Sequence, residues 1–245
     1  MHLLGERMMA GVLYIVSTPI GNPEDLTFRA LKILKEVAFI AAEDPHRTKQ
    51  LLDHYNVETP LTAYYNLNKE AKAPVFIKRL LEGESLAIVS DAGTPVIADP
   101  GYFLISQALA SGIRVVPIPG PSAVLAAITA SGLPGETFAF QGFAPAKSQP
   151  RRRFLEKLRS EPHTIILFVS WNQLRPMLKD ICKLLGARYL VLAKDLTTPH
   201  EEFIRGPSHE VLRAVTDRSV RGDLTLVIEG CISPNSSSER KRRNA

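Results

Sequence analysis

The stretch Leu86-Ala-Ile-Val-Ser-Asp-Ala-Gly-Thr-Pro95 joins an apolar run to a series of small and turn-forming residues that continues to Gly101. The apolar run Leu86–Val89 predicts a buried strand, and Pro95 fixes a turn soon after it. Ala92 and Gly93 carry almost no side chain, so the backbone is open to close approach by a ligand. The stretch therefore indicates a binding loop at the end of a strand rather than an ordinary surface connection.

Apolar runs alternate with helical patterns through the first half of the chain. Further strands are expected at Val12–Val16, Val37–Ala42, Leu61–Tyr65 and Ile113–Ile118. Helices are expected around Leu26–Leu34, Arg47–His54, Val75–Glu82, Tyr102–Ser111 and Ala123–Ser131. Such alternation is typical of parallel sheets, whose ligands bind at the carboxyl ends of the strands. We therefore expect one convergent site from the loops that follow Val16, Ala42, Val89 and Ile118.

The pattern changes after Gly135 and predicts a second α/β domain with a more mixed sheet. Its expected strands are Phe138–Gln141, Thr164–Val169, Tyr189–Ala193 and Leu224–Glu229, with helices at Leu174–Leu185 and His209–Thr216. The fold class is thus two α/β domains, the first with a mostly parallel sheet. The expected boundaries are an N-terminal extension at 1–11, an N-terminal domain at 12–134, a C-terminal domain at 135–232 and a disordered basic tail at 233–245.

Composition narrows the class of protein. The chain has 245 residues, 45% of them hydrophobic, which is enough for a proper core. It lacks a long apolar run and a signal-peptide pattern, so we expect a cytoplasmic protein that does not span a membrane. Cys182 and Cys231 have no CxxC spacing and the histidines are scattered, so we expect buried cysteines and no metal site.

Several common catalytic motifs are missing from the sequence. The glycines after the predicted strands belong to neither a GxGxxG fingerprint nor a GxxxxGK[ST] loop, which argues against dehydrogenases, kinases and ATPases. A GxSxG elbow and an HExxH helix are also absent. What remains is a set of Pro, Gly and Ser loops that can hold a ligand through backbone groups.

These loops resemble those of a known family. The motifs are Thr18-Pro-Ile-Gly-Asn22, Ala42-Glu-Asp44, Ser90-Asp-Ala-Gly-Thr-Pro95 with Asp99-Pro-Gly101, Pro119-Gly-Pro-Ser122, Gly142-Phe-Ala-Pro145 and Arg221-Gly-Asp223. In this order they resemble the tetrapyrrole methylase superfamily, and more narrowly its ribosomal RNA small subunit methyltransferase I branch. The resemblance spans Val12 to Gly230.

The resemblance implies S-adenosylmethionine as methyl donor, a cofactor cleft between the two domains and a homodimer. It also implies 2′-O-methylation of a cytidine ribose in small-subunit (16S) rRNA, either free or in the assembled small ribosomal subunit. In the first domain the cofactor site would include Pro19, Asp91, Ala92, Gly93, Thr94, Ile97, Ser122 and Ala123. In the second domain it would include Phe143, Ala193, Gly222 and Asp223.

Charged residues near the predicted strand ends are candidates for catalysis and RNA contacts. Attack of a ribose oxygen on a methyl group depends mainly on positioning, with help from a base, and the titratable candidates are Asp44, Asp91 and Lys194. Asp44 is an equally good helix cap. The net charge of +5 does not itself require nucleic acid. The residues expected to contact RNA phosphates, each also explicable as a solvated charge, are His46, Arg47, Lys147, Arg151, Arg152 and Arg153.

Two segments depart from the family pattern. Tyr65-Asn-Leu-Asn-Lys69 replaces a His-Glu-His-Asn-Glu-like segment, and Ser170-Trp-Asn-Gln-Leu-Arg175 replaces a Glu-Ser-Pro-His-Arg-like one. Trp171 fits a core or interface role better than base stacking. A non-catalytic RNA-binding or ribosome-binding relative is therefore one alternative. A tetrapyrrole C-methyltransferase is another, although the first loop lacks the GxGPGD pattern.

Overall fold

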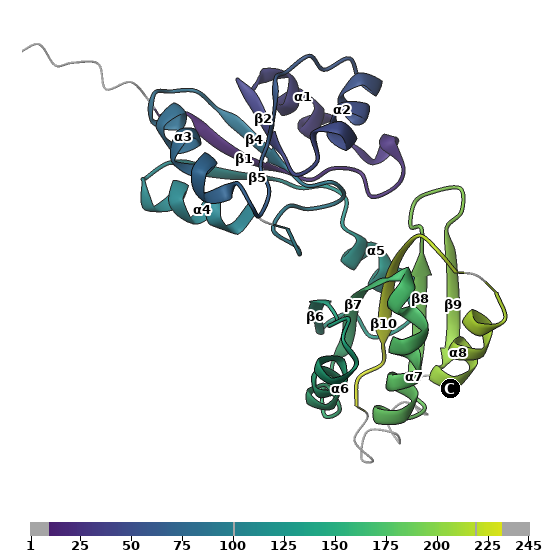
Figure 1. The fold of residues 1–245 in the computed structure, drawn as a ribbon. Coiled ribbons are helices and arrows are strands. Elements are labelled where there is room, and N and C mark those ends of the chain that lie inside the picture. Colours follow the sequence, from purple (N-terminus) through teal and green to yellow (C-terminus); the bar gives the residue numbers. More distant parts are fainter. Residues whose placement is uncertain (1–9, 100, 219, 232–245) are drawn as a thin grey trace, which may run out of the picture. The chain divides into compact units, whose positions relative to one another are not determined.

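The computed structural model describes residues 10–99, 101–218 and 220–231. The chain divides into two compact units, Met1–Ser122 and Ala123–Ala245, which are described separately (Figure 1). The predicted tail at 233–245 and most of the predicted extension, at 1–9, lie outside the described residues. Both units combine a five-stranded sheet with helices, which confirms the predicted fold class.

Unit 1 is built on a parallel sheet. Its strands are β1 (Val12–Val16), β2 (Phe39–Ala42), β3 (Leu61–Ala63), β4 (Leu86–Val89) and β5 (Arg114–Ile118). They lie in the order β3-β2-β4-β1-β5, and every neighbouring pair is parallel. The carboxyl ends of all five strands therefore lie along one edge of the sheet.

Helices cover both faces of this sheet (Figure 1). They are α1 (Phe28–Glu36), α2 (Pro45–His54), α3 (Lys69–Leu81) and α4 (Gly101–Ala110), with a short 3-10 turn η1 (Pro23–Asp25) before α1. Leu34 and Leu52, from α1 and α2, belong to the core on one face, whereas Phe76 and Leu104, from α3 and α4, belong to the core on the other. Strands β2 and β4 are consequently buried along their whole length.

Unit 2 has a mixed sheet. Its strands are β6 (Phe138–Phe143), β7 (Thr164–Ser170), β8 (Tyr189–Lys194), β9 (Glu202–Pro207) and β10 (Asp223–Ile228), in the order β6-β7-β10-β8-β9. Only β6 and β7 pair in parallel among these neighbours; the other three pairs are antiparallel. Its helices are α5 (Ala123–Thr129), α6 (Ser148–Lys157), α7 (Leu174–Leu184) and α8 (Ser208–Thr216), with the 3-10 turn η2 (Trp171–Gln173) before α7.

The division between the units falls earlier than the predicted boundary at 134/135. Helix α5 packs against β10, and the Thr164 hydroxyl donates to the Pro134 carbonyl at 2.7 Å. Arg205 of β9 also donates to the Ala130 carbonyl at 2.7 Å. These bonds hold residues 123–134 to the second sheet, although their composition continues the pattern of the first domain.

Three local expectations need correction. Helix α6 and strand β9 were not among the expected elements, because α6 is rich in charged residues and β9 contains Gly206 and Pro207. Cys182 is only partly buried and Cys231 is exposed, since the latter lies beyond the end of β10. Neither cysteine forms a disulfide in the part of the chain that the structure describes.

Candidate active site

The loops that follow β1 and β4 are joined by their backbones. Thr18 donates its N–H to the Gly93 carbonyl at 2.9 Å, and Gly93 returns an N–H to the Thr18 carbonyl at 3.0 Å. The Thr18 hydroxyl also donates to the Ser90 carbonyl at 3.1 Å. This isolated bridge lies beyond the ends of the neighbouring strands β1 and β4, and it fixes the two loops against each other.

Hydroxyl groups connect these loops to the loop after β5. The Ser17 and Thr94 hydroxyl oxygens lie 3.0 Å apart, and Thr94 donates to the Pro121 carbonyl at 3.1 Å. Gly120 comes so close to Ser17 that an added Cβ would lie 2.9 Å from the Ser17 Cβ. Three of the four predicted loops therefore meet through direct contacts.

Asp91 brings in the fourth loop, which follows β2. One carboxylate oxygen accepts the Asp44 N–H at 2.9 Å, and the other lies 3.5 Å from the Arg47 guanidinium. Asp44 is the N-cap of α2, where its side chain accepts the His46 N–H at 2.8 Å. The helix-cap role proposed for Asp44 is confirmed, and the predicted convergence of the four loops is confirmed as well.

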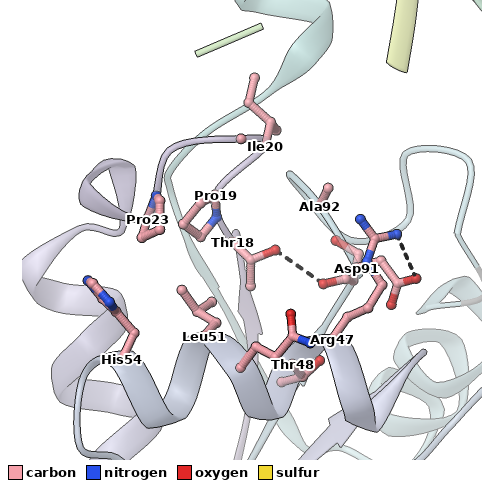
Figure 2. Close-up of a pocket in the computed structure, with 13 residues that line it drawn as sticks. Thr18, Pro19, Ile20, Pro23, Arg47, Thr48, Leu51, His54, Asp91 and Ala92 are labelled. Carbon is pink, nitrogen blue, oxygen red and sulfur yellow. Dashed lines mark hydrogen bonds and ion pairs between the residues drawn. The ribbon is translucent and has the colours of Figure 1, made fainter. Parts of the chain in front are cut away.

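These contacts frame a pocket of about 310 Å³ (Figure 2). Thr18, Pro19 and Ile20 line it from the loop after β1, and Asp91 and Ala92 line it from the loop after β4. The remaining side is the face of α2 that carries Arg47, Thr48, Leu51 and His54. The pocket thus combines apolar side chains with backbone groups and one charged pair, which suits a small polar ligand with an apolar part.

The loop after β4 contains unusual backbone conformations. Gly93 has φ +85°, and an added Cβ would lie 3.3 Å from the Ile20 Cγ2. Val96 and Ala98 also have positive φ values, 77° and 71°. Positive φ is costly for a β-branched residue such as Val96, and such conformations concentrate at functional sites.

A pair of carboxyls lies beside Asp91. Burial, together with the charge and the hydrogen bond of Glu43, raises the pKa of Asp99 to about 7. Burial and the Asp91 charge also raise the pKa of Glu43, against the opposing effects of the Asp99 hydrogen bond and Arg47. Asp99 therefore keeps its proton below about pH 7, and its hydrogen bond with Glu43 ties the end of β2 to the loop that precedes α4.

Three of the predicted site residues of unit 2, Lys194, Gly222 and Asp223, meet around Asp195. Lys194 forms an ion pair with Asp195, and the same aspartate accepts the Asp223 N–H at 3.0 Å. Gly222, with φ +114°, leaves room for this carboxylate, because an added Cβ would lie 2.0 Å from its Oδ1. Ala193 is buried beside Lys194 in β8. Phe143 is 59% exposed and packs on Phe168, with ring centroids 5.4 Å apart.

Arg151 requires a correction. It was expected to contact RNA, but it is buried, and its guanidinium lies 2.8 Å from Asp180 Oδ2 and donates to the Ala146 carbonyl at 2.8 Å. Arg152 donates to the other Asp180 oxygen at 2.9 Å while remaining half exposed. Burial tends to raise the pKa of Asp180, but the hydrogen bonds from the two arginines outweigh it and lower that pKa. Arg151 therefore serves the interior of unit 2.

The other predicted residues lie on the surface or at the loops. Lys147 is the N-cap residue of α6 and Arg153 lies within that helix, both at exposed positions. His46 and Arg47 lie in the first turn of α2. Ile97 is 40% exposed, in the loop before α4. Ser122 ends unit 1 and Ala123 begins α5.

Part of the site was not identified from the sequence pattern. The pattern did not single out Glu43 and Asp99 as a hydrogen-bonded pair, since the two residues are far apart in the chain and only the sheet brings them together. Leu51 and His54 were not singled out either. Their spacing from Arg47, four and seven residues along a helix, would have placed all three on one face.

The described residues contain neither a metal-ligand group nor a membrane-spanning helix. No group of histidine, cysteine, aspartate or glutamate side chains there could hold a metal ion. In residues 10–99, 101–218 and 220–231, no helix is both long and apolar enough to cross a bilayer.

The arrangement agrees with comparisons to known proteins. The profile of the tetrapyrrole (corrin/porphyrin) methylases matches residues 12–212. The chain belongs to the tetrapyrrole methylase family. Within it, this methylase is 44% identical over 225 residues to ribosomal RNA small subunit methyltransferase I of Halalkalibacterium halodurans, covering 92% of this chain and 78% of that one. It is 45% identical over 223 residues to the protein of the same name from Escherichia coli O157:H7, covering 90% and 78%.

A solved structure agrees on the fold of this methylase. Uroporphyrin-III C-methyltransferase from Thermus thermophilus, complexed with S-adenosyl homocysteine, superposes with a TM-score of 0.62 at 20% identity. The match covers 89% of this chain and 97% of the other. At 20% identity, this structural similarity supports the fold alone.

Proposed function

We propose that the protein transfers a methyl group from S-adenosylmethionine to the 2′-oxygen of a cytidine ribose in small-subunit (16S) rRNA. The identity of 44% to a ribosomal RNA small subunit methyltransferase I, across most of both chains, carries this proposal. The S-adenosyl homocysteine in the Thermus thermophilus structure supports the choice of donor. The hydrogen-bonded strand-end loops of unit 1 provide the place where such a donor would be held.

The residues of this edge fit the donor. Pro19 and Ile20 offer apolar contacts. The exposed Ala92 has a backbone N–H without an acceptor among the described residues, so it is available to a carboxylate or a ribose hydroxyl. Gly93 keeps the backbone accessible where a side chain would meet Ile20. We propose that Asp91, Thr94, Ile97, Ser122 and Ala123 complete the donor contacts of unit 1, and that Phe143, Ala193, Gly222 and Asp223 supply those of unit 2.

When bound, S-adenosylmethionine supplies an electrophilic methyl group. The chain's contribution would be to place the ribose hydroxyl in line with it and to assist loss of the hydroxyl proton. The proposed catalytic residues Asp44, Asp91 and Lys194 all have partners: a helix end, Arg47 and Asp195. We propose that they act mainly by orienting groups, because a carboxylate already accepting two contacts is a weaker base.

Exposed basic residues would hold the RNA. His46 and Arg47 lie in the first turn of α2, whereas Lys147, Arg152 and Arg153 belong to unit 2. Their contacts to phosphate would make binding salt-dependent. We further propose a cytoplasmic homodimer that acts on free rRNA or on the small ribosomal subunit, with size-exclusion chromatography coupled to light scattering as the test of the dimer.

Incubation with labelled S-adenosylmethionine and small ribosomal subunits that lack the modification tests the function. We expect label in the rRNA, on a 2′-oxygen of cytidine. Calorimetry with the donor alone tests the alternative of a non-catalytic relative. We expect the protein to bind the donor in the micromolar range, about −8 kcal/mol. If the protein binds the donor but does not label rRNA, the proposed substrate is wrong. If it does not bind the donor, the proposed methyltransferase activity is wrong.

A further inference from the structure

A second pocket, also of about 310 Å³, lies within unit 2 at the carboxyl end of β7. Its walls are η2 with the start of α7, the C-terminal end of α8, and the residues just before β10. The antiparallel register pairs Ser170 with Asp223, which brings Trp171 and Arg221 next to each other at this end of the sheet. Helices α7 and α8 and strands β7 and β10 are labelled in Figure 1.

The pocket has an apolar floor and a polar rim. Leu174, Val215 and Val220 are 1%, 1% and 8% exposed, so the floor is continuous with the core of unit 2. Trp171 is 50% exposed, which is unusual for so large an apolar side chain. The Arg221 guanidinium lies over the indole ring, 5.3 Å from its centroid. An aromatic face and a planar cation are therefore presented together.

The two arginines of the pocket have different roles. Arg175 donates to the carbonyls of Val215, Thr216 and Arg218 at 3.1–3.3 Å, so it fixes the C-terminal end of α8 as one wall. Arg221 makes neither an ion pair nor a hydrogen bond with the described residues. Its positive charge is free for an external anion. Its guanidinium covers one face of the indole ring, and Trp171 is still 50% exposed.

We propose that this pocket binds one nucleotide of a single-stranded RNA segment, with the base against Trp171 and the adjoining phosphate on Arg221. This inference rests on the proposed function and adds a substrate contact to it. A stacking ring next to a cation matches a base and the phosphate that adjoins it in a nucleic acid strand. An acidic peptide would use the charge of Arg221 but would leave the exposed indole without a planar partner.

The position in the chain supports the same reading. Arg221 immediately precedes Gly222 and Asp223, the residues that we propose as donor contacts in unit 2. Trp171 lies one residue after the end of β7, at the same end of the sheet as Asp223. The proposal gives Trp171 the stacking role that the sequence analysis disfavoured.

Trp171 is the only tryptophan of the chain, so it reports directly on the pocket. Titration of the full chain with a cytidine- and uridine-containing RNA hexanucleotide should quench its fluorescence, with a matching rise in the anisotropy of a labelled copy of the RNA. Poly-glutamate serves as the acidic-peptide probe. Equal binding of poly-glutamate, or RNA binding that leaves the tryptophan signal unchanged, would overturn the proposal.

Four variants separate stacking from charge. Trp171→Leu and Arg221→Gln should each weaken RNA binding about tenfold, whereas Trp171→Phe should retain most of the affinity. Arg221→Gln should also lower the slope of log K against log salt by about 0.7, the value for one phosphate contact of a single strand. Arg159→Gln removes the same charge from an exposed position before β7, and should change neither. Unchanged affinity in both Trp171→Leu and Arg221→Gln would contradict the inference.

The methylation assay distinguishes the two proposals. If Arg221→Gln methylates small subunits with the KM of the original protein, the subsite fails and the proposed function stands. If the original protein shows RNA-dependent quenching but labels no rRNA, the proposed function fails and the subsite stands. Thermal melting of each variant confirms that a loss of affinity does not come from unfolding.

Discussion

The two units bring their polar residues together in different ways. In unit 1 every strand is parallel, so Thr18, Asp44 and Asp91 lie at one edge because each follows the carboxyl end of a strand. In unit 2 the antiparallel pairs place the end of one strand beside the start of the next, as with Lys194 and Leu224. Residues after strand ends can thus be grouped from sequence in the first unit, whereas grouping in the second requires the register.

One charged pair from each unit shows a further difference, which is the exposure of the side chains. Arg47 and Asp91 are 59% and 26% exposed by side chain, at the rim of a pocket. Arg151 and Asp180 are each 6% exposed, inside unit 2. A buried pair is costly to break because the remaining charge is left without a partner, whereas an exposed pair contributes little to stability. The two pairs should therefore respond very differently to substitution.

The largest effect should come from the buried pair. We expect Asp180→Ala to lower the free energy of unfolding by about 3–5 kcal/mol, because it leaves Arg151 buried without its counter-ion. Urea denaturation measures this. Glu202→Ala, which breaks the exposed pair with Arg218, is the control and should cost less than about 1 kcal/mol. A loss of under about 1 kcal/mol for Asp180→Ala would remove the distinction between the buried and the exposed pairs.

The next effect concerns donor binding in unit 1. We expect Gly93→Leu to weaken the binding of S-adenosylmethionine at least about 100-fold, or about 2.7 kcal/mol, because the side chain would meet Ile20 and block the backbone. Gly112→Leu is the matched control, since Gly112 also has positive φ but nothing within 4 Å of an added Cβ. Calorimetry checks both; equal affinities would show that the donor binds elsewhere.

The Glu43–Asp99 pair predicts a pH dependence that is specific to unit 1. The pKa of Asp99 is raised from 3.8 to about 7 in the folded protein, so the folded state binds more protons than the unfolded chain between these values. The contribution of Asp99 to the free energy of unfolding therefore falls as the pH rises from about 4 to about 7. Asp99→Asn should flatten this fall, by about 1 kcal/mol at a partly exposed site. Denaturation at a series of pH values measures the change, and identical curves would rule out the raised pKa of Asp99.

The smallest effect should come from the exposed pair. We expect Arg47→Gln to lower the free energy of unfolding by less than about 1 kcal/mol. Lys49→Gln, which breaks the exposed pair with Asp53 on the same helix, is the control and should have a similar effect. Urea denaturation compares them. A much larger loss for Arg47→Gln would mean that the rim of the pocket depends on this charge as strongly as unit 2 depends on Arg151.

Much of the fold could be predicted because its signals are local. The strands β1 and β4 have the predicted bounds, and α7 and α8 differ from prediction only at their ends. The glycine and proline residues after the strands marked the loops that converge in unit 1. Helix α6 and β9 could not be predicted in this way, because their few apolar residues give no clear period, and contacts with distant elements decide their structure.

The sequence by itself determined the fold class and the site edge of unit 1, because strand periodicity and the parallel rule need no distances. The family followed from the resemblance of its ordered loop motifs. Only the tertiary structure decided the state of individual charges. It buried Arg151 against Asp180, brought Glu43 to Asp99, and left Arg221 exposed beside Trp171. The physical reason is that burial and partner charges depend on residues far away in the chain, which no local pattern records.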